Sequence, residues 1–105
     1  DAWHEIMPVA EPAPGAPRVT ADLVGPVCES GDFIAQGRDM HEMAAGDLYA
    51  IGSAGAYGAV QAGTYNTRPL VPEVLVRGDC FHVVRPRPSL ESLIGLDSLP
   101  PWLES

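Results

Sequence analysis

Residues 73–85 read Glu-Val-Leu-Val-Arg-Gly-Asp-Cys-Phe-His-Val-Val-Arg. Two runs rich in β-branched and aromatic residues flank a Gly-Asp pair, which is a typical two-residue turn of a β-hairpin. Two prolines follow closely, and they end the second run because proline cannot donate to a strand ladder. The stretch therefore predicts an antiparallel hairpin with strands over 73–77 and 80–85.

Outward from this hairpin, the chain consists of short apolar runs separated by glycine and proline, which number 11 each among 105 residues. Such a composition disfavours long helices and favours strands joined by turns. Further strands are expected over 2–9, 19–29, 33–35 and 48–51. Residues 38–45 are expected to form a polar connection, and 11–18 a loop. The pattern predicts a mainly β fold, a small barrel or sandwich, in one domain spanning 1–105.

One or two short helices are expected beside these strands. The glycine-rich stretch 52–58 can open a helix that continues through Gln61. Ser89 is a suitable N-cap for a second helix, whose apolar side carries Leu90, Leu93, Ile94 and Leu96. The tail over 100–103 is expected to dock on a surface.

The net charge of −8 argues against nucleic-acid binding. The chain has six basic residues besides histidine, all of them arginine, and nucleic-acid binding needs a basic face that displaces counterions. No apolar run approaches the roughly 20 residues of a membrane span. The chain contains no lysine, so any Schiff-base amine must come from elsewhere. Its abrupt start at Asp1 suggests a cut chain.

The cysteines and histidines do not form a metal-binding pattern. His4, His41 and His82 are scattered, and none has the short paired spacing of a zinc site. Cys28 and Cys80 are able to form one disulfide, although thiols in a reducing compartment are the favoured interpretation. We therefore expect no bound metal.

A first chemical cluster lies at residues 27–32, Val-Cys-Glu-Ser-Gly-Asp. A cysteine thiol is mostly protonated near neutral pH, and carboxylates at Glu29 and Asp32 disfavour a second negative charge beside Cys28. This setting suits a general acid better than a nucleophile, which needs a basic neighbour. On these residues alone, a small buried cysteine followed by an ordinary polar turn is the favoured interpretation.

Two further clusters contain tyrosine. In Gly-Ala-Tyr-Gly at 55–58, the glycines let backbone N–H groups approach an anion, and the Tyr57 phenol can donate to a phosphate oxygen. Tyr-Asn-Thr-Arg-Pro at 65–69 offers polar groups to a site. On the residues alone, ordinary turns and loops are the favoured interpretation of both stretches.

Taken in order, these motifs resemble the C-terminal domain of diaminopimelate decarboxylases, within the alanine-racemase-like group of pyridoxal-phosphate enzymes. The resemblance extends over nearly the whole chain. It rests on the stretches 2–6, 24–32, 46–48, 55–58, 65–69 and 72–76.

This resemblance implies a β-barrel domain that works with a TIM-like barrel domain of the same chain, in a cytoplasmic homodimer whose active sites form where two subunits meet. It implies that Cys28 is the general acid, delivered into the partner subunit's site. Glu29 would contact the distal amino group of the substrate, and Tyr57 both cofactor and substrate. The cofactor would be pyridoxal 5′-phosphate, attached to a lysine of the other domain. Tyr65, Asn66 and Arg68 receive no separate role.

Two alternatives remain at this point. The first is a related decarboxylase of another basic amino acid or polyamine precursor, although relatives acting on ornithine or arginine typically carry Asp after the cysteine, where this chain has Glu29. The second is a β-barrel interaction module without catalysis. In the implied family the barrel also takes a strand from the far N-terminus, so the isolated chain is expected to pair, swap or aggregate through an open edge.

Overall fold

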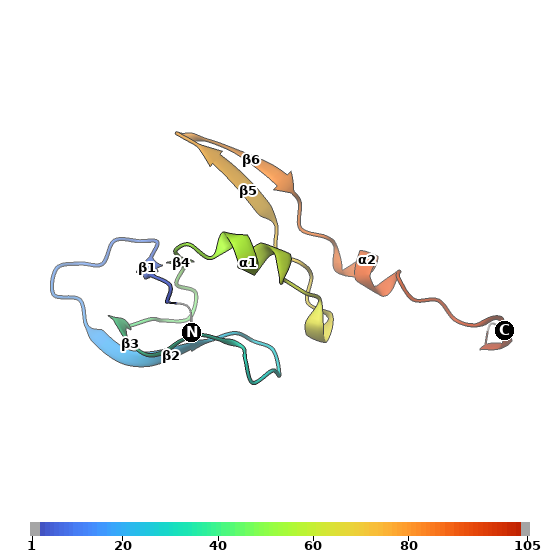
Figure 1. The fold of residues 1–105 in the computed structure, drawn as a ribbon, viewed down its shortest axis with the longest axis horizontal. Helices are drawn as coiled ribbons and strands as arrows, with labels where there is room; N and C mark the ends of the chain where they lie inside the picture. The colour runs from blue at the N-terminus through green and yellow to red at the C-terminus, as the bar shows by residue number, and fades with distance from the viewer. Residues whose placement is uncertain (1–2, 104–105) are drawn as a thin grey trace. The chain divides into compact units, whose positions relative to one another are not determined.

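The computed structural model describes residues 3–103. The chain divides into two compact units, residues 1–56 and 57–105, and its strands form three two-stranded antiparallel sheets (Figure 1). The expected mainly β class with two short helices is confirmed. A closed barrel is not formed by the strands within 3–103, because each of them pairs along one edge only and closure needs two neighbours for every strand.

The first sheet of unit one joins two short strands that are distant in sequence. Strand β1 (Ile6–Pro8) pairs with β4 (Tyr49–Ile51). Backbone hydrogen bonds from Val9 N to Leu48 O (3.0 Å) and from Gly52 N to Glu5 O (2.8 Å) extend the pairing at both ends. Strands were predicted over 2–9 and 48–51, and both are confirmed with narrower bounds; residue 2 lies outside the described part of the chain.

The second sheet is a long hairpin of β2 (Arg18–Val24) and β3 (Phe33–His41). The prediction of a polar connection over 38–45 was wrong for residues 38–41, which belong to β3. A β-bulge explains the error. Gly37 has a φ of +57°, and its N–H donates to Asp22 Oδ1 at 2.7 Å.

The bulge sets the direction of the side chains in β3. Ala35 and Met40 are the two hydrophobic residues within 3–103 that are buried, at 7% and 4% exposure. They lie five positions apart, so regular alternation would send them to opposite faces of the strand. One extra residue in the bulge restores a common face, which a simple alternation pattern in the sequence does not reveal.

Two side chains join the sheets within unit one. The guanidinium of Arg38, on β3, donates to His4 O at 2.7 Å and lies 4.5 Å from the centre of the Trp3 ring. The Tyr49 hydroxyl, on β4, donates to His41 O at 3.2 Å. These contacts hold the β1–β4 pair beside the β2–β3 hairpin.

Unit two contains the hairpin that the sequence predicted. Strands β5 (Glu73–Arg77) and β6 (Cys80–Arg85) pair with the expected bounds. Gly78 adopts a φ of +61° at the first central position of the turn, where a type II′ turn prefers glycine. Arg85 anchors the base of the hairpin through Glu73 Oε1 at 3.2 Å and Val71 O at 3.0 Å.

The helices are short. Helix α1 (Gly55–Val60) confirms the expected helix in the glycine-rich stretch. Helix α2 (Leu90–Ile94) starts after Ser89, whose hydroxyl accepts from Ser92 N at 3.1 Å, as predicted for an N-cap. Two 3-10 turns, η1 (Tyr65–Thr67) and η2 (Pro101–Leu103), complete the described chain. No helix within residues 3–103 is long and apolar enough to cross a membrane.

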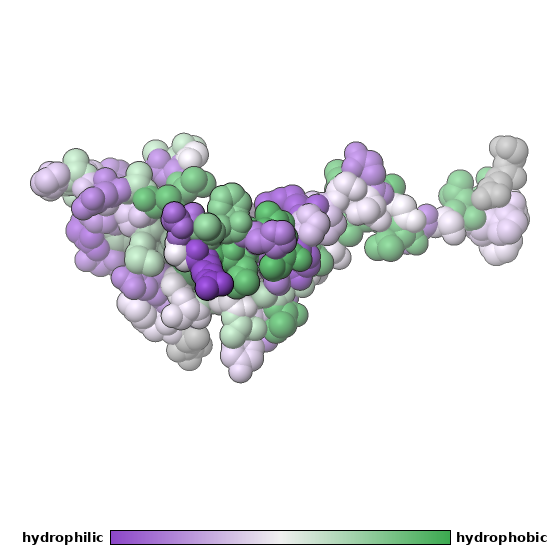
Figure 2. Space-filling view, turned by 90° about the horizontal axis from the view of Figure 1, so that it is seen from above, coloured by the Kyte–Doolittle hydropathy of each residue, from purple (hydrophilic) through white to green (hydrophobic). Residues whose placement is uncertain are grey.

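Apolar side chains of unit two lie open to solvent. In the β5–β6 hairpin, one face carries only apolar residues, and all of them are exposed: Val74, Val76, Phe81 and Val83. Trp102, in the tail that was expected to dock, is 82% exposed. Hydrophobic residues, drawn green, are likewise visible on the face shown in Figure 2. Within residues 3–103, many hydrophobic side chains are therefore left uncovered by packing inside the chain.

Candidate functional site

The loop between β2 and β3, residues 25–32, is held by the carboxylate and carbonyl of Asp32. Val27 N donates to Asp32 Oδ2 at 2.9 Å, and Gly25 N donates to Asp32 O at 2.8 Å. One residue thus binds two backbone N–H groups on the opposite side of the loop. Since a side-chain acceptor of this kind replaces a strand partner, the loop keeps a defined path beyond the last pair of the sheet, Val24 and Phe33.

Glycine at position 25 is required by the close approach of Asp32. A Cβ atom built on Gly25 would collide with the carboxyl group of Asp32. No such atom can be accommodated while the carboxylate keeps its bond to Val27 N. Gly25 and Asp32 therefore form a matched pair across the neck of the loop.

Glu29 turns its carboxylate back onto its own loop. Gly31 N donates to Glu29 Oε2 at 2.7 Å, and the Ser30 hydroxyl lies 3.5 Å from Oε1. Asp32 N donates to Glu29 O at 3.1 Å. The Glu29 carboxylate is exposed, so a cationic group outside the loop can still approach it.

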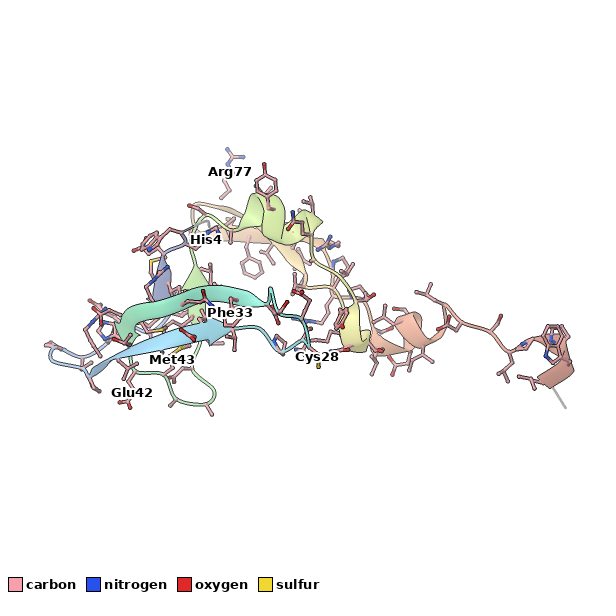
Figure 3. The ribbon with its side chains drawn as sticks, turned by 60° about the horizontal axis from the view of Figure 1, so that its bottom comes forward. His4, Cys28, Phe33, Glu42, Met43 and Arg77 are labelled. Carbon is pink, nitrogen blue, oxygen red and sulfur yellow. The ribbon has the colours of Figure 1, made fainter. Side chains whose placement is uncertain are left out.

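Cys28 lies between these two anchors and is exposed. Figure 3 shows it in the loop end of the β2–β3 hairpin, away from Glu42 at the other end. Cys80 is also exposed and starts β6, with its Sγ 3.5 Å from Asp79 Oδ1. The loop thus presents a thiol and a carboxylate as chain neighbours at the tip of a hairpin, an arrangement able to donate a proton and bind an amine side by side.

Tyr57 lies on helix α1 and is the first residue of unit two. Its side chain is 74% exposed. Space is open around the Cα atoms of Gly55 and Gly58, since a Cβ at either would meet no atom within 4 Å. The phenol is therefore available as a hydrogen-bond donor to a group from outside the chain.

The other polar candidates fall outside these two elements. Residues 65–67 form the turn η1, in which Asn66 and Thr67 both have a φ of +58°. His4 is engaged with Gly52 O at 3.0 Å, and His82 is exposed on β6. Within residues 3–103, no three His, Cys, Asp or Glu side chains are grouped as metal ligands would be.

Two residues with clear structural roles were not singled out by sequence reasoning. Asp32 had been considered only as a charge near Cys28, although it closes the loop. Arg38 had been assigned to a connection, although it joins two strand pairs. A signal existed for Asp32, because Asp and Asn commonly accept backbone N–H groups in turns, and a glycine seven residues earlier allows the approach.

Comparison with known proteins identifies the family to which this chain is similar. Residues 1–55 match the family model described as pyridoxal-dependent decarboxylase, C-terminal sheet domain. Diaminopimelate decarboxylase of Zymomonas mobilis is 48% identical over 103 residues, which cover 98% of this chain and 24% of that protein. The chain thus spans about a quarter of the length of the curated relatives it matches.

Solved structures agree with the sequence matches. The crystal structure of diaminopimelate decarboxylase from M. jannaschi superposes with a TM-score of 0.84 at 30% identity, covering 97% of this chain and 23% of that chain. The enzyme from Helicobacter pylori, complexed with L-lysine, gives a TM-score of 0.77 at 37% identity, covering 90% of this chain and 23% of that chain. The loop that presents Cys28 lies inside the region matched by the family model, and the chain belongs to the C-terminal sheet domain family of the pyridoxal-dependent decarboxylases.

Proposed function

We propose that this chain is the C-terminal domain of a diaminopimelate decarboxylase, which converts meso-diaminopimelate to L-lysine and carbon dioxide. The observation that carries the proposal is the loop 25–32, which presents Cys28 and Glu29 together in the segment that matches the decarboxylase family. Relatives at 48% and 49% identity are named for this activity. In this proposal both compact units, residues 1–105, act as one domain of a longer protein.

Glu29 is proposed to select the substrate. Diaminopimelate carries a second amino group at its far end, and a carboxylate binds an ammonium group by a charge-assisted hydrogen bond. The Glu29 carboxylate is exposed, and it accepts hydrogen bonds from Gly31 N and from the Ser30 hydroxyl of its own loop. A substrate ammonium can add to these donors without displacing the backbone N–H.

Cys28 is proposed to be the general acid. Its thiol would give a proton to the carbon from which carbon dioxide departs. Positioned proton transfer of this kind contributes about 10²- to 10⁴-fold in rate.

The residues present fit an accessory role toward pyridoxal phosphate. When bound, this cofactor supplies a ring that takes up the electron pair left by departing carbon dioxide. The exposed phenol of Tyr57, flanked by open space at Gly55 and Gly58, can donate a hydrogen bond to one of the two, cofactor or substrate, and accept one from the other. The covalent attachment has to come from another domain, since this chain has no lysine.

The proposal extends to partners and location. Cys28 and Glu29 lie at the tip of a hairpin, where they can project into a site built by the protein's N-terminal barrel domain in a partner subunit of a homodimer. Apolar surface left open on β5 and β6 is consistent with burial against other parts of such an assembly. An enzyme of amino-acid biosynthesis whose two cysteines form no disulfide fits the reducing environment of the cytoplasm.

The direct test is a substrate comparison with the full-length protein loaded with pyridoxal phosphate. Carbon dioxide release is measured with meso-diaminopimelate, ornithine and arginine as substrates. We expect kcat/KM for diaminopimelate to exceed the other two by at least about 10²-fold, since a site built around a charged partner rejects a poorly fitting substrate strongly. Equal or higher kcat/KM for ornithine or arginine would instead support the related decarboxylase, and no release from any substrate an interaction module.

A further inference from the structure

We infer that Asp32 is a positioning residue, whose carboxylate fixes the backbone at Val27 and thereby the place of the Cys28 thiol. The inference rests on the proposed function, because it concerns how Cys28 reaches the reacting carbon. Val27 N donates to Asp32 Oδ2 at 2.9 Å, and Val27 directly precedes Cys28. The Asp32 carboxylate therefore binds the backbone of the residue directly before Cys28.

The two carboxylates of the loop have different tasks. Glu29 is anchored by Gly31 N at 2.7 Å, and this bond involves neither Val27 nor the Asp32 side chain. Asp32, by contrast, accepts the hydrogen bond from Val27 N, in the first half of the loop. Loss of the Asp32 carboxylate should therefore displace Cys28 more than Glu29, and should affect the chemical step more than substrate binding.

Gly25 provides an independent route to the same effect. A methyl group at this position would collide with the Asp32 carboxyl group. Gly25→Ala therefore moves the carboxylate away from Val27 while leaving Asp32 chemically intact. Once Asp32 is shortened to alanine, the colliding atoms are gone, and alanine at position 25 should be tolerated.

Asp22 supplies a matched control in the same hairpin. Its carboxylate also accepts a backbone N–H, that of Gly37, at 2.7 Å. This bond stabilises the bulge in β3 rather than the loop 25–32. Asp22→Ala removes the same kind of hydrogen bond from the same sheet without touching the loop that carries Cys28.

The experiment measures kcat and KM for meso-diaminopimelate in the full-length, cofactor-loaded protein. A displacement of about 1 Å can lower a rate about 10²-fold, so we expect Asp32→Ala to lower kcat by about 10- to 100-fold. KM should change less than about threefold, since the anchor of Glu29 remains. Asp32→Asn, whose amide oxygen can take the bond from Val27 N, should stay within about threefold of wild type, and Asp22→Ala within about twofold.

The double-mutant cycle decides the mechanism. We expect Gly25→Ala to lower kcat about tenfold in the wild-type background and less than about twofold in the Asp32→Ala background, because neighbouring residues that act together are not additive. Hydrogen exchange over residues 25–32 should accelerate in Asp32→Ala and not in Asp32→Asn, which identifies a local change in variants that still fold. Additive effects in the cycle, or Asp32→Asn as damaging as Asp32→Ala, would overturn the inference.

Failure of the proposed function gives a different result. If Cys28→Ala kept wild-type kcat, the thiol would not be the proton donor, whatever the loop does. If Cys28→Ala is inactive while Asp32→Ala keeps wild-type kcat and wild-type exchange over 25–32, the thiol acts and Asp32 does not position it. The two claims are thus separated by independent variants.

Discussion

Met40 is the most buried hydrophobic residue within 3–103, at 4% exposure, and its truncation should loosen the β2–β3 hairpin. Replacing a buried methionine by alanine costs about 2–5 kcal/mol, depending on how far the neighbours can close the cavity. Few residues around it are buried, so relaxation is easy and we expect the lower end, about 2 kcal/mol. At about 1.4 kcal/mol per factor of ten, this corresponds to about 30-fold in a local opening equilibrium.

The assay is hydrogen exchange of the β2 and β3 amides in the full-length protein, under conditions where the rate reports the opening equilibrium. Met40→Ala should raise these exchange rates about 30-fold. Met43→Ala is the control, since Met43 follows β3 and is 38% exposed; it should change the rates less than about threefold. Equal effects of the two variants would refute the assignment of Met40 to the core.

Three further outcomes are expected. Ser89→Ala removes the N-cap bond to Ser92 N and should cost about 1 kcal/mol, seen as about fivefold faster exchange in α2 but not in β5 or β6; unchanged exchange in α2 would contradict the cap. Tyr57→Phe should weaken retention of pyridoxal phosphate about 5- to 10-fold in the full-length protein, as expected for one lost hydrogen bond; a cofactor titration with wild-type affinity would remove that role. The isolated 105-residue chain should self-associate through its open strand edges and apolar hairpin face, and a sharp monomer boundary in sedimentation would argue against this.

The sequence predicted an element correctly where residues close together in the chain determine it. The β5–β6 hairpin follows from Gly78-Asp79 between two apolar runs, and its strand bounds match. The start of α2 follows from the Ser89 hydroxyl. In both elements the deciding interaction lies within a few residues, so pattern and structure agree.

Features that depend on residues distant in the sequence were harder to predict. β3 was only partly predicted because the bulge at Gly37 changes the alternation midway through the strand, and a bulge depends on the partner strand. The role of Asp32 requires knowing that its carboxylate faces Val27 across the loop, which only the pairing of β2 with β3 brings about. The choice of Cys28, Glu29 and Tyr57 came from family resemblance, because the residues alone favour ordinary turns.

The most direct test of the proposed function is the single-turnover rate of the full-length enzyme with meso-diaminopimelate when the two thiols are replaced in turn. Cys28→Ala should slow proton delivery by about 10²- to 10⁴-fold, with substrate affinity changed less than about threefold. Cys80→Ser, which alters another exposed thiol, in the β5–β6 hairpin, should remain within about twofold of wild type. A Cys28→Ala enzyme that turns over at the rate of the Cys80→Ser enzyme would contradict the account.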